Sequence, residues 1–203
     1  MWFDEIKQGV AGASSPSRLF IYYNERAREG RVGKNIPVSL RDGYKCVASL
    51  GACPETMWPY RVGAFARKPT AACYRAGRVR RVTSYHRIRR ELGPMRACLA
   101  EGFPFTFAIT VHKSFESAAV TRTGRVPIPR RGDPTLGGHA MLAVGYDDDQ
   151  ACFIVRNSFG ARWGIAGHCV LPYDYLMRPD LAWDFWTARH GARGRAGVRG
   201  GAR

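Results

Sequence analysis

Apolar residues recur with two different periods along the chain, and the period changes after Gly102. Before that point they follow the spacing of amphipathic helices, and beyond it large residues alternate with smaller ones, as in strands with one buried face. Helices are predicted over residues 17–28, 40–50 and 94–101, and strands over residues 105–111, 141–146, 152–156 and 168–171. Helices followed by strands favour an α+β fold with a helical lobe and an antiparallel β lobe.

The same pattern divides the chain into three parts. Residues 1–85 are predicted to form the helical lobe and residues 86–189 the β lobe, and the Gly-, Ala- and Arg-rich residues 190–203 are predicted to be a disordered basic tail. Residues 52–70 hold three prolines and three aromatic residues in irregular order, which indicates a packed loop. Residues 2–8 are typical of a helix end.

The composition is that of a folded protein. Of the 203 residues, 45% are hydrophobic and 24% are charged, which differs from the composition of disordered chains. No apolar run approaches the ~18 residues of a membrane helix, and the acidic first residues differ from a secretion signal. We therefore expect neither a membrane span nor an intact secretion signal in this sequence.

Positive charge is the strongest compositional feature, with a formal net charge of +16. Clustered cations can neutralise phosphates, so nucleic acid is one possible partner. The charge consists of 27 arginines and 5 lysines, with eight arginines between Arg75 and Arg96 and four in the tail. We interpret it as a solvated background rather than a binding face, and we do not expect nucleic acid as the partner.

Six cysteines are spread along the chain without a Cys-x-x-Cys pair. This spacing argues against a zinc site or a thioredoxin-like redox pair, and no metal or organic cofactor is predicted. The even number permits disulfides without requiring them, so the redox compartment stays open. Cys46 and Cys98 lie in helical apolar patterns, which is typical of buried small hydrophobic residues.

Candidate chemistry is concentrated in the segment GGHAMLAVGYDDDQACFIVRNSFGARWGIAGH. His139 stands at the start of one predicted strand and Asn157 at the end of the next, with an Asp-rich hairpin between them. Antiparallel strands joined in this way bring their far ends together. The Asn oxygen can accept a hydrogen bond from one imidazole nitrogen and leave the other facing a nucleophile, which is the orienting half of a Cys-His-Asn triad. A structural histidine is the alternative.

This segment resembles the His and Asn motifs of papain-like cysteine peptidases. The family pattern is a Gly- or Asp-preceded His-Ala, then Val-Gly-Tyr, Asn-Ser-Trp-Gly, Trp-Gly and Gly-Tyr, and the order and spacing match. Upstream, PSRLFIYYNER, RDGYKCVASLGACPETMWPY and the stretch from SYHRI to VHKSFES look like the helical lobe and crossover of bacterial members. The resemblance covers residues 2–189 and implies a two-lobe papain-like fold, cysteine-type peptidase activity of the C1 type, and a peptide or protein substrate.

The resemblance also implies roles for individual residues. His139 matches the general base that activates the thiol and later protonates the leaving amine, and Asn157 matches the residue that orients it. Trp163 matches an aromatic residue that limits solvent access to the His–Asn bond, and it could equally be a core aromatic. Phe159 stands where the family has Trp, and His168 where the family has Tyr. These two departures fit either relaxed constraint or ordinary family variation.

The family's nucleophile lies in a Gln-x(5)-Cys stretch at the start of the central helix of the helical lobe. Residues 1–9 look like the last turns of that helix, so the resemblance implies that the Cys and the oxyanion-hole Gln lie before Met1 and that the start of this helix is lacking. None of the six cysteines follows a Gln at that distance or stands at a predicted helix start. We therefore predict no replacement nucleophile and no activity for the chain as given.

Three functions follow from these observations, in descending order of support. The first is a cysteine peptidase, whose thiolate attacks a peptide carbonyl and forms an acyl-enzyme. The second is a non-catalytic papain-like module that binds peptides without cleaving them. The third is a basic nucleic-acid-binding protein, whose binding would depend steeply on salt. We expect a monomer.

Overall fold

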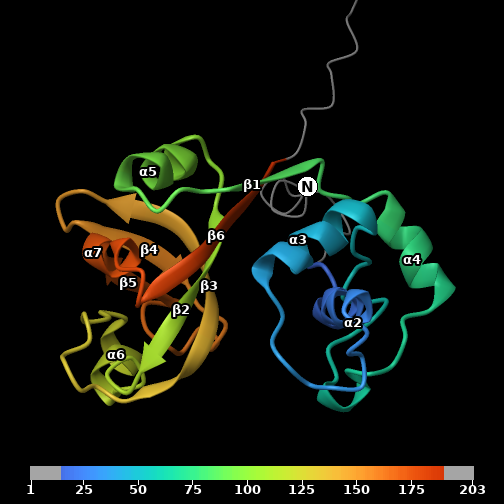
Figure 1. Cartoon of the computed structure of the whole chain (residues 1–203), viewed down its shortest axis with the longest axis horizontal. Coiled ribbons are helices and arrows are strands. Elements are labelled where there is room, and N and C mark those ends of the chain that lie inside the picture. Colours follow the sequence, from blue (N-terminus) through green and yellow to red (C-terminus); the bar gives the residue numbers. More distant parts are fainter. Residues whose placement is uncertain (1–14, 190–203) are drawn as a thin grey trace, which may run out of the picture.

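The computed structural model describes residues 15–189, which form two halves side by side (Figure 1). We call residues 15–83 the helical half and residues 84–189 the sheet half. The helical half contains α2 (Arg18–Arg28), α3 (Leu40–Ser49), the short 3-10 helix η1 (Val62–Ala64) and α4 (Ala71–Arg78). The helix end predicted at residues 2–8 and the disordered tail predicted at residues 190–203 lie outside the described residues.

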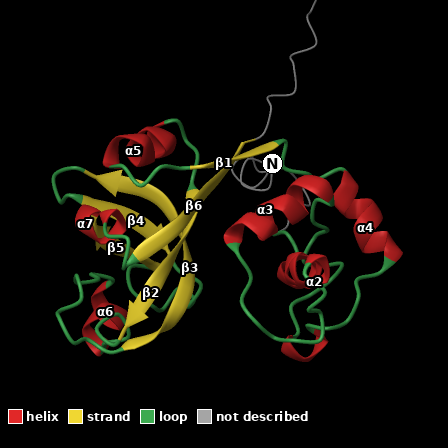
Figure 2. Ribbon diagram, viewed as in Figure 1, coloured by secondary structure: helices red, strands yellow, loops and turns green. Residues whose placement is uncertain are grey.

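The sheet half is built on one six-stranded antiparallel sheet (Figure 2). Its strands are β1 (Ser84–Arg87), β2 (Phe105–His112), β3 (Thr135–Asp147), β4 (Cys152–Arg156), β5 (His168–Pro172) and β6 (Ala182–Arg189), in the spatial order β1-β6-β2-β3-β4-β5. Three helices, α5 (Leu92–Ala100), α6 (Ala118–Thr123) and α7 (Tyr173–Met177), lie on the side of the sheet away from the helical half. The predicted α+β fold class is confirmed.

The alternating pattern of β2 explains where the core lies. Phe105, Phe107, Ile109 and Val111 are at most 7% exposed, and the residues between them are partly exposed. These side chains belong to one apolar cluster with residues of α5, α6 and α7. Because each Å² of apolar surface removed from water contributes about 25 cal/mol, this layer between the sheet and the three helices stabilises the sheet half.

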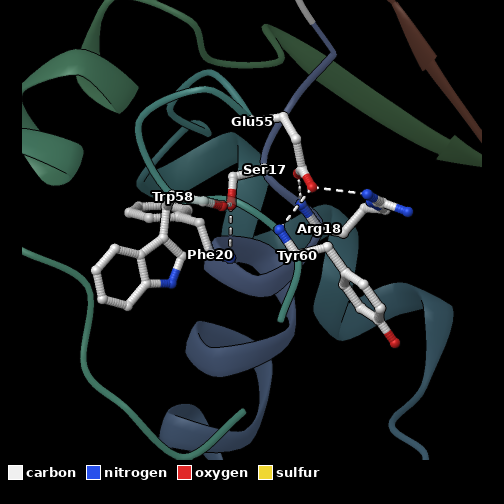
Figure 3. Close-up of polar contacts among 6 residues, drawn as sticks. All are labelled: Ser17, Arg18, Phe20, Glu55, Trp58 and Tyr60. Carbon is white, nitrogen blue, oxygen red and sulfur yellow. Dashed lines mark hydrogen bonds and ion pairs between the residues drawn. The ribbon is translucent and has the colours of Figure 1, made fainter. Parts of the chain in front are cut away.

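The start of α2 is held by a loop of the helical half (Figure 3). Ser17 is the buried N-cap, and its hydroxyl accepts from the Phe20 N–H at 3.1 Å and donates to the Trp58 carbonyl oxygen at 2.6 Å. The Glu55 carboxylate accepts from the backbone N–H of Arg18 at 2.9 Å and from its guanidinium at 2.7 Å. A side-chain acceptor and an anion both stabilise a helix N-terminus, so these contacts fix where α2 begins.

Hydrogen bonds from α3 to the sheet join the two halves. The Leu40 N–H donates to Asp184 Oδ2 at 3.1 Å. The Tyr44 hydroxyl lies 3.0 Å from Thr106 Oγ1 and donates to the Trp186 carbonyl oxygen at 3.1 Å. Because these partners are 62 to 144 residues apart in the sequence, the contacts fix how the halves face each other.

Besides the three-residue helix η1, five elements are not predicted by the hydrophobic pattern: α4, β1, α6, α7 and β6. Helices α6 and α7 have only six and five residues, which is too short for a helical period to be visible. In β6 the alternation is broken at Asp184, which has φ +59° and lies where the register with β2 shifts. Strand β1 ends in two exposed residues, and its pairing with β6 is what makes it a strand.

Strand β3 begins at Thr135, six residues before its predicted start. The prediction that His139 stands at the start of a strand was therefore wrong, because His139 lies inside β3. Gly137 and Gly138 suggest a break in the sequence, yet both pair with β2 in the sheet. Strand propensity depends on context, and here the neighbouring strand outweighs the low propensity of glycine.

The Glu25 carboxyl is partly buried where α2 packs against α3. A Cβ on Gly43 would lie 2.6 Å from Glu25 Oε1, so the glycine leaves room for the carboxyl. The pKa of Glu25 is raised to about 7, mainly by burial. The positive charge of Arg26 opposes this shift, and the Asp42 carboxylate adds to it. Between pH 4.5, the ordinary pKa, and pH 7, the folded protein therefore keeps a proton that the unfolded chain has lost.

The free energy of unfolding is expected to decrease as pH rises through this interval, because ionised Glu25 opposes folding. One pKa unit corresponds to about 1.36 kcal/mol, and the carboxyl keeps some solvent contact, so we expect a decrease of about 1–3 kcal/mol. Glu25→Gln should remove it, whereas Glu116→Gln, which changes an exposed carboxyl, should not. Urea unfolding at pH 5 and pH 8 measures the difference, and an unchanged pH dependence in Glu25→Gln would exclude this origin.

Candidate active site

Strands β3 and β4 bring the His139 and Asn157 side chains together. His139 pairs with Ile109 of β2, and Asn157 directly follows the last residue of β4. The two strands are antiparallel, with Leu142 opposite Arg156. His139 Nε2 lies 2.8 Å from Asn157 Oδ1, so one hydrogen bond joins the two side chains.

The partners of Asn157 decide which imidazole nitrogen carries the proton. The Ser158 backbone N–H donates to Asn157 Oδ1 at 2.7 Å, which identifies this atom as the amide oxygen. Because an amide oxygen only accepts, His139 Nε2 must donate to it. In the neutral ring Nδ1 then carries a lone pair, and it has no hydrogen-bond partner among residues 15–189. His139 is thus oriented as a base with a free nitrogen.

Asn157 is buried and is held through its backbone. It is 8% exposed, and its backbone N–H donates to the Gly167 carbonyl oxygen at 2.9 Å. Its Nδ2 is buried and finds no partner in the described part of the chain. An unpaired buried polar group costs about 1–3 kcal/mol, so stability alone does not favour asparagine at this position.

Three aromatic rings surround the pair. Phe159 stacks on the His139 ring, with centroids 5.1 Å apart and an interplanar angle of 27°, and the Phe115 centroid lies 6.4 Å from that of His139. Trp163 contacts Phe159 at 5.6 Å and Phe115 at 5.8 Å. Phe159 is 51% exposed and Trp163 only 7%, so Phe159 covers the imidazole and Trp163 supports it from the core. Sequence reasoning missed Phe115, which lies in the VHKSFES stretch without any motif that singles it out.

A glycine-containing loop connects Asn157 to β5. Gly164 has φ +59°, and a Cβ there would lie 2.3 Å from the His168 carbonyl oxygen, so the loop requires glycine at this position. His168 opens β5, and its Nδ1 lies 3.1 Å from the Ala166 carbonyl oxygen. The imidazole at the position where the family has tyrosine thus contacts its own loop.

A groove of about 490 Å³ runs beside the pair, between the two halves of the molecule. It is lined by Arg18 of the helical half and, in the sheet half, by Thr106, residues 140–142, residues 156–158 and Gly160. A ligand in this groove would touch Asn157 and the residue that follows His139.

The six cysteines all lie within the described residues, and none is hydrogen-bonded to this pair. No hydrogen bond or ring contact of His139 involves any of them, and all six are buried and free of disulfides. Burial raises the pKa of the Cys46 thiol to about 11, and those of Cys53 and Cys169 to about 12. A nucleophilic thiol needs a lowered pKa, so these environments disfavour that role.

The expectation that no cysteine stands at a helix start is wrong for Cys73. It stands in the first turn of α4, where its N–H donates to the hydroxyl of the N-cap Thr70. Helix α4 is not predicted from the sequence, so this position could not be recognised. The Cys73 thiol lies 3.3 Å from the Thr70 hydroxyl and is buried within the helical half.

No group of three or more His, Cys, Asp or Glu side chains within residues 15–189 is arranged to hold a metal ion. None of the helices in this part of the chain has the length and hydrophobicity needed to cross a membrane.

The sequence of the chain matches a known protein family and a known relative. The family described as papain family cysteine protease matches residues 39–175. A peptidase C1-like protein of Acanthamoeba polyphaga mimivirus is 38% identical over 192 residues, an alignment that covers 91% of this chain but 62% of the relative.

Solved structures give the same result. Xylellain, a cysteine protease from Xylella fastidiosa, superposes with a TM-score of 0.86 at 38% identity, covering 94% of this chain and 76% of that one. The digestive procathepsin L 3 of Tenebrio molitor shares the fold, with a TM-score of 0.64 at 16% identity over 91% of this chain and 58% of that one. The chain belongs to the papain family of cysteine proteases.

Proposed function

We propose that the chain is part of a cysteine peptidase in which His139 is the general base and acid and Asn157 orients it. The observation that carries the proposal is the 2.8 Å bond between His139 Nε2 and Asn157 Oδ1, which leaves Nδ1 free to accept a proton. An oriented base with a free nitrogen is the arrangement that activates a thiol.

The proposed reaction proceeds in two halves. His139 Nδ1 takes the proton of a thiol, the thiolate attacks the peptide carbonyl carbon, and the imidazolium returns the proton to the leaving amine, which yields a thioester. His139 then takes a proton from water, the hydroxide attacks the thioester, and the thiol leaves with that proton. Throughout, Asn157 keeps the ring in the required tautomer and stabilises the imidazolium.

The nucleophilic thiol is proposed to come from a segment outside these 203 residues. All six cysteines of the chain are buried, and burial raises the pKa of five of them. Without that thiol, His139 has nothing to activate, and the 203 residues alone are expected to cleave no peptide. The substrate is proposed to be a peptide or protein segment lying in the groove beside Asn157.

The same observation about the cysteines supports a second candidate, a papain-like module that binds peptides without cleaving them. Both candidates use the groove, and they differ in whether the native protein contains a reactive thiol.

Asn157→Ala separates an orienting role from a structural one. When this variant is expressed from the complete native gene, we expect its kcat for hydrolysis of a fluorogenic peptide to fall by about tenfold to a hundredfold. The optimum pH should also shift, because the imidazolium loses its partner. Asn35→Ala, which removes an exposed amide that accepts from Tyr22, is the control and should keep full activity. Full activity in Asn157→Ala would refute the proposed role.

A further inference from the structure

The net positive charge of the two halves lies mostly in the helical half, because this half has few acidic residues. Residues 15–83 contain 14 Lys and Arg against 4 Asp and Glu, whereas residues 84–189 contain 13 against 10. A solvated background would be spread over both halves. The excess of cations over acids is therefore a property of the helical half.

A hollow of about 850 Å³ lies on this half. It is lined by Asn24, Leu50, Lys68, Ala71, Tyr74, Arg75 and Arg78. Three of these seven residues are cations and none is an acid. The hollow shares no lining residue with the groove beside Asn157, so it is a separate surface.

Within residues 15–189, the three cations Lys68, Arg75 and Arg78 form no ion pair with an acidic side chain. Other basic side chains of the protein do pair, as Arg18 does with Glu55 and Arg189 with Glu101. Among the described residues, no ion pair involves any of the three. An anion from outside the chain would supply the missing counter-charge.

The helix dipole explains only part of this arrangement. Arg75 and Arg78 lie near the C-terminal end of α4, where a cation is favourable, but as like charges three residues apart they repel each other. Lys68 precedes the N-terminal end of α4, where a cation is unfavourable. The three charges line the same hollow.

The uncharged part of the lining indicates the class of anion. Leu50 and Ala71 offer apolar contact between the charges. Tyr74, whose ring packs against Phe20 at 5.0 Å and whose hydroxyl donates to Asn24 at 2.9 Å, is the one aromatic residue of this lining, so successive bases would find a single ring to stack on. Binding of single-stranded nucleic acid relies on such stacking. A peptide with acidic and aliphatic side chains can pair with the three cations and contact the apolar atoms of the lining at the same time.

We propose that the hollow at α4 binds an acidic peptide segment of a partner or substrate protein through Lys68, Arg75 and Arg78. Binding there is independent of whether the His139 and Asn157 pair cleaves peptides. A binding measurement that requires no peptidase activity therefore tests the proposal.

The test uses the full 203-residue protein and a fluorescently labelled peptide of ten glutamates, with fluorescence anisotropy at two salt concentrations. The double variant Arg75→Gln, Arg78→Gln should raise the Kd about tenfold. The matched control, Arg130→Gln with Arg131→Gln, removes the same charge from two exposed arginines of the sheet half and should change the Kd less than twofold. Because all four arginines are exposed, equal urea midpoints are expected for the variants and the parent protein.

Three outcomes would overturn the proposal. The peptide fails to bind, or both double variants weaken it equally, in which case only the net charge matters. In the third, ten-nucleotide single-stranded DNA binds more tightly than the peptide and loses affinity in Arg75→Gln, Arg78→Gln, which would assign the hollow to nucleic acid instead.

Discussion

Replacing His139 by alanine is expected to lower kcat/KM for peptide hydrolysis by the native protein at least about a thousandfold. The reason is that Nδ1 of this ring is the only proposed proton acceptor for the thiol and the only donor for the leaving amine. Phe159 and Asn157 would still shape the site, so peptide binding in the groove should change much less than the rate.

The control for this prediction is His86→Ala, which removes an exposed imidazole from β1. It should retain the activity of the parent protein. If His139→Ala cleaves the peptide at the parent rate, the observed hydrolysis comes from another site, and the assignment of His139 is wrong.

The second large effect concerns stability, and it is expected for Arg26→Met. Arg26 is 0% exposed, and its guanidinium donates to the carbonyl oxygens of Val32 and Lys34, at 2.7 and 3.0 Å, and of Phe65 at 2.5 Å. The guanidinium also lies over the Tyr22 ring at 3.9 Å. It thus ties α2 to two separate loops of the helical half.

Methionine fills a similar volume but donates no hydrogen bond, so it leaves these carbonyl groups buried without their donor. Since each such group costs about 1–3 kcal/mol, the free energy of unfolding should fall by about 3–5 kcal/mol. Arg26→Lys should recover only part of the loss, because one ammonium group cannot reproduce the geometry of the planar guanidinium.

Urea unfolding of the full chain measures this effect. Arg28→Met, on the same helix but exposed, is the matched control and should change the free energy by less than about 0.5 kcal/mol. A loss below about 1 kcal/mol in Arg26→Met would mean that the loops hold together without this residue.

Arg26 also shows what a sequence pattern cannot predict. Within the predicted helix 17–28, an arginine between Glu25 and Ala27 has the sequence signature of a solvated position. It is buried because two loops return over α2 and present backbone carbonyls to it, and these contacts reach up to 39 residues along the chain. Helix propensity and hydrophobic periodicity depend on residues that are close in the sequence. They therefore do not predict contacts with loops that fold back over the helix.

The pairing of His139 with Asn157 was predictable for the opposite reason. A short hairpin joins β3 to β4, so the geometry of two adjacent antiparallel strands is sufficient to bring the side chains together. The role of Phe115 was not predictable, because it reaches the imidazole from a turn after β2. The charge of the helical half was likewise visible as composition, but the hollow that gathers it depends on α4, which the pattern did not show.

The most direct measurement is the site of fast thiol alkylation in the native protein purified from its source. A brief reaction with iodoacetamide near pH 6, followed by intact mass and peptide mapping, identifies the most reactive cysteine. We expect one equivalent of label on a cysteine outside residues 1–203, at a rate that His139→Ala reduces. Label found only on the six buried cysteines, or no fast label at all, would contradict a cysteine peptidase and leave a papain-like binding module.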